Sequence, residues 1–389
     1  MILTPDRVLI LFLLYTIMDE DMQVLEKEQK KQAVSRPAIR KAEHLQYIHY
    51  LRGLAILLIV GFHCRTSYEW SSEIEQRSWF ALLTQSTIIF VFIGGLLFQH
   101  LNHQHFNFKR YLGKKLKFVI LPYILMSIPA LANQVLFDDY KPWLPEWMEG
   151  SSPAGLIGYM LITGKHLGPF WFIPMISIFY LIAPAMLWLD KQPWFYRFVL
   201  PAILIASFFQ YEFGYEAPTW ESFLYYFPIY MVGMWASRYR RHILALDMKV
   251  VLPIAIFYLG ITALQVFDVL AIGKNYGFYT ELPDNATVVN FGKMKISIAC
   301  IALLVLFYKI RKIRIPLLDF MANYSFGVYF IHLYVIRITE TGLSKAGFSM
   351  PFNTLTFIAW LALITGICVA AIFTIKKITG KQSRYFIGS

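Results

Sequence analysis

Two ionisable side chains, Arg52 and His63, lie in a long apolar stretch of the sequence. Such groups are costly inside hydrocarbon, so each is a functional candidate by default. Eleven residues apart on a helix, they face the same way and lie about 16 Å apart along the axis. Arginine binds phosphate through a fixed fork of donors, and histidine transfers protons near neutral pH. Alone, Arg52 is typical of a residue that snorkels and His63 of an interhelical hydrogen bond. Together on one stripe they indicate a polar pathway.

The elements that position this stripe follow from composition. Of 389 residues, 57% are hydrophobic and 15% charged, and the mean hydropathy is +0.51. These values exclude a disordered protein, a coiled coil and a disulfide scaffold. Apolar stretches that suit a crossing of about 30 Å of hydrocarbon recur ten times. They lie near 47–65, 81–101, 117–136, 170–189, 198–211, 222–237, 250–270, 294–308, 317–338 and 354–375. The predicted fold class is therefore all-α: a polytopic integral membrane protein with about ten transmembrane helices.

Basic residues predict the orientation of these spans. The segments after the even-numbered spans hold 19 lysines and arginines, whereas those after the odd-numbered spans hold 7. The basic side of a membrane protein is cytoplasmic, so both termini are expected in the cytoplasm. The net charge of +12 is thus a topology signal with the lipid bilayer as partner, and it does not require nucleic acid.

Three regions are expected along the chain. Residues 1–46 form a cytoplasmic tail, because the apolar run from Val8 to Met18 is too short to span. This tail lies on the membrane surface, or else the true start is Met18 or Met22. Residues 47–376 form the membrane domain, and 377–389 a short basic cytoplasmic tail. We see no internal repeat of the kind that inverted-repeat transporters show.

Other polar residues are weaker candidates. Ser325 and His332 are seven residues apart and share a helix face with Tyr329. They orient His63, line the acceptor side, or form buried polar contacts between helices. Trp171 is either an interfacial anchor, the commoner role, or a surface on which a sugar ring stacks. Cys64 is rotated about 100° from His63 and does not suit a nucleophile pair. No metal-ligand cluster is expected.

Three further motifs accompany the Arg52–His63 spacing. They are the basic segment from Phe106 to Tyr123, the stretch from Pro169 to Met175, and the run from Tyr324 to His332. Together they resemble the membrane acyltransferase-3 family over about residues 45–375. The chain is most similar to the polysaccharide-modifying subgroup, which includes the acyltransferase of the poly-N-acetylglucosamine (intercellular adhesin) locus. One departure is that Lys114 and Lys115 stand where the family often has arginine, so bidentate phosphate binding is lost there.

The resemblance implies O-acylation of a cell-surface or exported polysaccharide in a bacterial inner membrane. The donor is cytoplasmic acyl-CoA carrying acetyl or succinyl, a substrate and not a permanently bound cofactor. His63 acts as general base or forms an acyl-histidine, Arg52 contacts the donor, and the basic segment holds its phosphates (Lys109, Arg110, Lys114, Lys115, Lys117). The positive-inside rule alone also explains that segment. Two alternatives stay open: a transporter or flippase without acyl-transfer chemistry, and an inactive member of a polysaccharide synthase complex.

Overall fold

The computed structural model describes residues 46–137, 144–210, 218–270, 272, 289–348 and 351–388. Apart from Gln46, the tail expected over 1–46 lies outside these residues. Within the described ranges every regular element is helical, and the single β-type contact is an isolated bridge between Trp70 and Phe352. The all-α prediction is therefore confirmed for this part of the chain.

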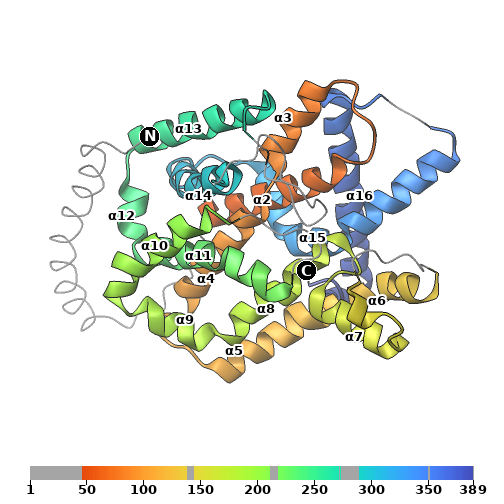
Figure 1. The fold of residues 1–389 in the computed structure, drawn as a ribbon, viewed down its shortest axis with the longest axis horizontal. Coiled ribbons are helices and arrows are strands. Elements are labelled where there is room, and N and C mark those ends of the chain that lie inside the picture. The colour runs from red at the N-terminus through yellow and green to blue at the C-terminus, as the bar shows by residue number, and fades with distance from the viewer. Residues whose placement is uncertain are drawn as a thin grey trace. The chain divides into compact units, whose positions relative to one another are not determined.

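Figure 1 shows the helices in chain order. They are α2 (Gln46–Cys64), α3 (Glu73–Leu83), α4 (Thr87–Asn102), α5 (Phe108–Lys115), α6 (Leu121–Leu136), α7 (Pro153–Thr163), α8 (Phe172–Leu181), α9 (Ala183–Asp190), α10 (Leu200–Ser207), α11 (Thr219–Arg238), α12 (Arg240–Ala245), α13 (Met248–Val266), α14 (Phe291–Lys309), α15 (Pro316–Lys345), α16 (Thr354–Thr379) and α17 (Ser383–Phe386). Three shorter turns matter below: the π-helical η1 (Leu116–Ile120) and η4 (Phe195–Val199), and the 3-10 turn η3 (Gly168–Trp171).

Every predicted span overlaps with helix in the described chain, but not every helix is long and apolar enough to cross a membrane unaided. Six helical segments of the described chain meet that condition: 46–64, 73–102, 108–136, 248–266, 291–309 and 354–379. A seventh is the pair α8–α9, which bends by 61° between its two parts. The chain is thus a multi-pass membrane protein. The count of ten stays a prediction, since it also requires η4–α10, α11 and α15 to cross.

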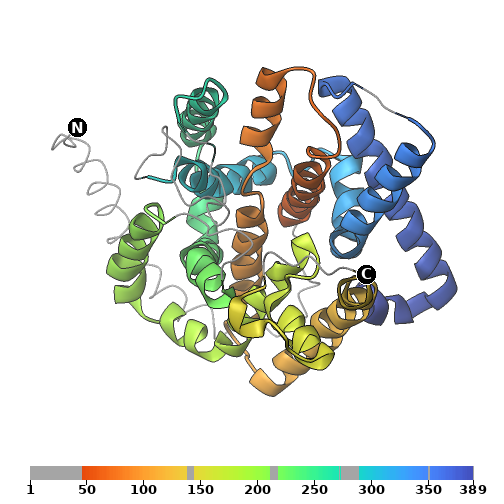
Figure 2. The ribbon, with the colours of Figure 1, turned by 45° about the vertical axis from the view of Figure 1, so that its right-hand side comes forward.

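Helices far apart in the sequence lie side by side. Helix α15 packs along α2, α11 along α4, and α14 along α13 (Figure 2). Close approach depends on glycine: a Cβ on Gly53 would collide with the carbonyl of Leu318, and one on Gly95 with the carbonyl of Tyr230. Small residues at such contacts are typical of membrane helices, where apolar burial alone gives no drive to associate.

The C-terminal segment differs from the simple tail expected over 377–389. Helix α16 continues to Thr379, and the chain then turns through a 3-10 turn, Gly380–Gln382, into α17. Helix α17 packs against α6, and Ser383 and Ile387 are buried. This segment is therefore part of the folded domain.

Candidate active site

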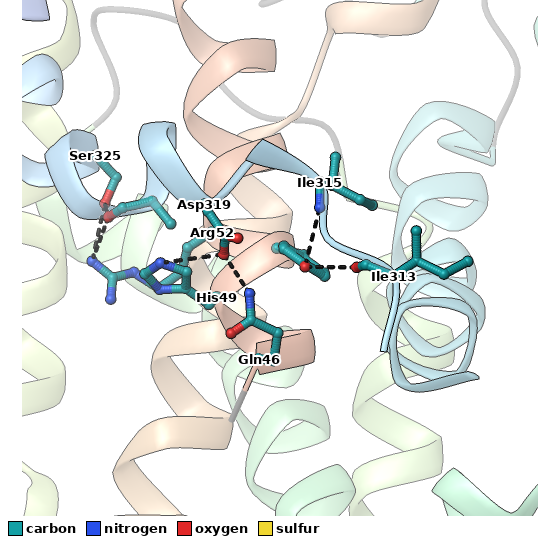
Figure 3. A network of polar contacts seen from close by, with 9 residues as sticks. Gln46, His49, Arg52, Ile313, Ile315, Asp319 and Ser325 are labelled. Carbon is teal, nitrogen blue, oxygen red and sulfur yellow. Dashed lines mark hydrogen bonds and ion pairs between the residues drawn. The ribbon is translucent and has the colours of Figure 1, made fainter. Parts of the chain in front are cut away.

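Helices α2 and α15 carry most of the predicted site residues. At the N-terminal end of α2, Arg52 donates through one terminal nitrogen to Ser325 Oγ at 3.0 Å and to the Ala322 carbonyl at 3.3 Å. Ser325 donates in turn to the Ala322 carbonyl at 2.9 Å. Figure 3 shows this contact between the two helices. The structure thus brings together two residues whose separation in the sequence gives no direct sign of contact.

Further contacts fix the same end of the helix pair. Gln46 donates to Asp319, and His49 Nε2 lies 3.8 Å from the same carboxylate. The Tyr50 hydroxyl donates to the Ile313 carbonyl at 2.8 Å and accepts from the Ile315 backbone N–H at 3.2 Å (Figure 3). The start of α15 is therefore held firmly against α2 beside Arg52.

The two histidines meet at the other end of these helices. The ring centroids of His63 and His332 are 5.2 Å apart, with 47° between the ring planes. His332 is fully buried, whereas His63 is half-buried. His332 Nδ1 lies 3.0 Å from the Val328 carbonyl and 2.9 Å from the Tyr329 carbonyl. His332 Nε2 is buried without a hydrogen-bond partner in the described chain.

The turn η3 covers the histidine pair. The Tyr329 hydroxyl donates to the Pro169 carbonyl at 2.7 Å, which anchors η3 to α15. A Cβ built on Gly168 would lie 4.0 Å from His63 Cε1, so the backbone of η3 approaches the imidazole closely. The Tyr329 hydroxyl therefore has a structural role: it holds η3 in place beside His63.

Trp171 is half-buried at the end of η3. Its ring stacks on Tyr226 of α11, with centroids 5.7 Å apart and 23° between the planes. One face of the indole is therefore already covered by protein. A stacking role toward a sugar ring remains a prediction, and only the other face would serve it.

The basic segment lies on α5 and η1. Lys109, Arg110, Lys114 and Lys117 are exposed there, and Lys115 is half-buried. The Lys115 ammonium lies 4.5 Å from the Tyr180 ring centroid, and that of Lys117 lies 4.9 Å from Tyr385. Among the described residues no hydrogen bond or ion pair joins this segment to Arg52, whose hydrogen bonds go to Ser325 and Ala322. Four of its five cations are therefore exposed, and binding of the donor phosphates by this segment stays a prediction.

A cavity of about 950 Å³ lies between α6, α7 and α8. Its lining is mostly apolar and includes Tyr123, Tyr159, Lys165, Ile173 and Trp220. Neither histidine lines it, so it is not the reaction centre suggested by the sequence. Ionisable groups inside a membrane domain are functional candidates by default, so the chemistry of the α2–α15 pair carries more weight than the size of this cavity.

Sequence reasoning missed two buried lysines of α14. Lys293 and Lys295 are fully buried. Lys295 Nζ donates to the Ala81 carbonyl at 2.8 Å, to Thr262 Oγ1 at 2.9 Å and to Gln265 Oε1 at 2.7 Å. Lys293 Nζ donates to the Tyr225 carbonyl at 2.8 Å. Lys295 lies inside the predicted span 294–308, and an ionisable residue inside a span is a functional candidate by default, so the sequence did contain a signal for it.

The chemistry available at the histidine pair is proton transfer. An imidazole can take a proton from a hydroxyl and return it to a leaving group. Cys64 is buried in an apolar cluster beside the pair, and a thiol in apolar surroundings is inert. Among the described residues no group of three or more His, Cys, Asp or Glu side chains is placed to hold a metal ion.

Comparison with known proteins gives one match. The sequence profile of an acyltransferase domain matches residues 45–375. No curated protein and no solved structure matches the chain, so the predicted polysaccharide-modifying subgroup is not confirmed. The profile covers α2 to almost the end of α16, and therefore every candidate residue above.

Proposed function

The chain belongs to the acyltransferase-domain family, and from this premise we propose that it transfers an acyl group from acyl-CoA to a hydroxyl of a cell-surface or exported polysaccharide. The protein is a membrane acyltransferase; the donor, the acceptor and a bacterial inner membrane as its place are the proposal. The observation that supports it best is the His63–His332 pair, which joins the same two helices as the Arg52–Ser325 hydrogen bond.

In this proposal His63 is the general base. The acceptor hydroxyl gives its proton to the imidazole while its oxygen attacks the thioester carbonyl. The carbon–sulfur bond then breaks, and the leaving CoA sulfur takes the proton from His63. An acyl-histidine intermediate would split the same reaction into two steps.

Arg52 suits the donor because part of its guanidinium is unused. Its contacts with described residues all pass through one terminal nitrogen, to Ser325 and Ala322. The remaining N–H groups are available for an anion or a carbonyl of the donor. The exposed lysines and arginine of α5 and η1 would hold the nucleotide phosphates at the cytoplasmic face.

The test uses purified protein in lipid vesicles, labelled acetyl-CoA or succinyl-CoA, and polysaccharide as acceptor. We expect His63→Ala and His63→Gln to lower acyl transfer on the order of 10²–10⁴-fold. His63→Gln retains hydrogen-bonding reach, so it should insert and fold normally. His105→Gln, which changes an exposed histidine between α4 and α5, is the matched control and should be fully active.

Two results would contradict the proposal. If His63→Gln matches the wild type at equal protein level, His63 is structural. If the wild type moves polysaccharide across the vesicle membrane but never releases CoA, the chain is a transporter and the mechanism is wrong.

A further inference from the structure

The hydrogen bonds of His332 determine which of its nitrogens carries the proton. Nδ1 lies within 3.0 Å of the carbonyl oxygens of Val328 and Tyr329. A carbonyl only accepts, so Nδ1 must carry the hydrogen that lies between them. In a neutral imidazole the other nitrogen, Nε2, is then a bare acceptor. That acceptor is buried and unpaired in the described chain.

The neighbour of this acceptor is His63. The two rings are 5.2 Å apart between centroids, which is close enough for a small rotation or the arrival of a substrate to join them. The His63 ring touches Phe62 and His332, and its nitrogens make no hydrogen bond to a described residue. The charged groups that act on His63 are Arg65, just beyond α2, and Arg337 of α15. Both are cations, so neither can accept a proton from it.

We propose that His332 is the positioning residue of the reaction: its Nε2 accepts a hydrogen bond from one nitrogen of His63, which aims the other nitrogen at the acceptor hydroxyl. This rests on the proposed function. When His63 takes the hydroxyl proton it becomes a cation with two N–H groups. One of them returns its proton to the leaving sulfur, and the other is held by the lone pair of His332. His332 itself gains and loses no proton.

The arrangement corresponds to the base and its orienting partner in a catalytic triad, with a neutral imidazole in place of the usual carboxylate. If His332 served only as polar glue between helices, its buried acceptor would be expected to have a partner at rest, because burying an unpaired acceptor is unfavourable. An unpaired acceptor beside the proposed base instead suits a site whose hydrogen bonds are completed only when substrate is present.

Two substitutions separate positioning from packing. In His332→Asn the shorter amide can still donate to the helix carbonyls in place of Nδ1, but it lacks an acceptor at Nε2. In His332→Gln the longer amide can place its oxygen near Nε2 and loses the donor to the carbonyls. We expect His332→Asn to lower kcat by about tenfold to a hundredfold, within the contribution of the base it serves. The KM for acyl-CoA should stay unchanged, and His332→Gln should recover much of kcat.

The outcomes are distinct. If the wild type transfers no acyl group from any acyl-CoA, the proposed function fails before His332 is tested. If the wild type is active and His332→Asn equals it, or if Asn and Gln lower kcat equally, the positioning role is wrong while the function stands. A double variant His63→Gln with His332→Asn should be no slower than His63→Gln alone. An additive further loss would likewise contradict a role exerted through His63.

Discussion

At the scale of single residues, Arg52 offers the sharpest separation of a structural from a chemical role. Its one engaged nitrogen anchors it to Ser325, and its remaining donors are the ones that the proposal assigns to acyl-CoA. Arg52→Ala should raise the KM for acyl-CoA about tenfold to a hundredfold, the equivalent of one charge-assisted hydrogen bond. The KM of Arg52→Lys should lie between those of the wild type and Arg52→Ala, since lysine keeps the charge but loses the forked pair of donors.

Ser325→Ala is the matched control for this comparison. This substitution removes the hydrogen-bond partner of Arg52 but leaves the arginine charge in place. The KM of Ser325→Ala for acyl-CoA should therefore rise less than that of Arg52→Ala. Full activity in both arginine variants would mean that Arg52 merely snorkels at the helix end.

The two helix faces of the site could be predicted from the sequence, but their approach to each other could not. The spacing of Arg52 and His63 and the periodicity of Ser325 and His332 give two helix faces. The 5.2 Å approach of the two histidines requires α2 and α15 to be neighbours, and 250 or so intervening residues hide that relation from periodicity. The Gly53 contact that permits the approach is equally invisible without its partner, the carbonyl of Leu318.

At the scale of elements, the direction of α2 relative to α15 constrains the topology. Gln46 contacts Asp319, Arg52 contacts Ser325, and His63 faces His332. The contacts advance together along both helices, so the helices are parallel. Two parallel spanning helices need an odd number of crossings between them. Four segments between α2 and α15 are long and apolar enough to cross unaided. If α15 also crosses, either one or all three of α8–α9, η4–α10 and α11 must therefore cross as well.

The loop between α7 and η3 should make stability depend on pH. His166 is buried there, with Nδ1 3.0 Å from the Met160 carbonyl and Nε2 2.8 Å from Ser127 Oγ of α6. Burial lowers the pKa of His166 to about 4, whereas an unfolded histidine has a pKa of about 6.5. The unfolded chain therefore binds the proton first, and stability falls as the pH drops from about 6.5 to 4. At about 1.4 kcal/mol per pKa unit, the full loss is about 3 kcal/mol.

Thermal unfolding in detergent at pH 7.5 and pH 5 measures this effect. His166→Gln should reduce the difference in Tm between the two pH values, and His105→Gln, at an exposed histidine, should leave it as in the wild type. An unchanged difference in His166→Gln would show that another group causes it.

At the scale of the whole molecule, the orientation rests on the excess of basic residues after even-numbered spans. A phosphatase fused after Ser389 should be inactive, because it stays in the cytoplasm, whereas one fused after Glu149 should be active in the periplasm. Relative protein levels measured by immunoblot control for expression. The reverse pattern would overturn the orientation and with it the cytoplasmic placement of the donor.

The helical type and the approximate position of the predicted spans followed from the sequence in the described part of the chain, because lipid leaves the backbone no other choice. Breaks within spans were not. The bend between α8 and α9, the interruption of 73–102 between α3 and α4, and the separate short helix α7 depend on tertiary packing, which hydropathy does not record.

The buried lysine of α14 has a consequence for how the chain is made. A lysine at the centre of an inserting helix costs about 2.5–3.5 kcal/mol, and Lys295, in the second turn of α14, adds a smaller cost of the same kind. All three oxygens that receive Lys295, on Ala81, Thr262 and Gln265, are synthesised before it. Helix α14 therefore reaches the translocon when its partners are already in the bilayer, and its insertion is cooperative with theirs. Gln265→Leu should lower the inserted fraction of α14 in a glycosylation-mapping assay, and Lys295→Leu should restore it; insertion unaffected by Gln265→Leu would show that α14 enters alone.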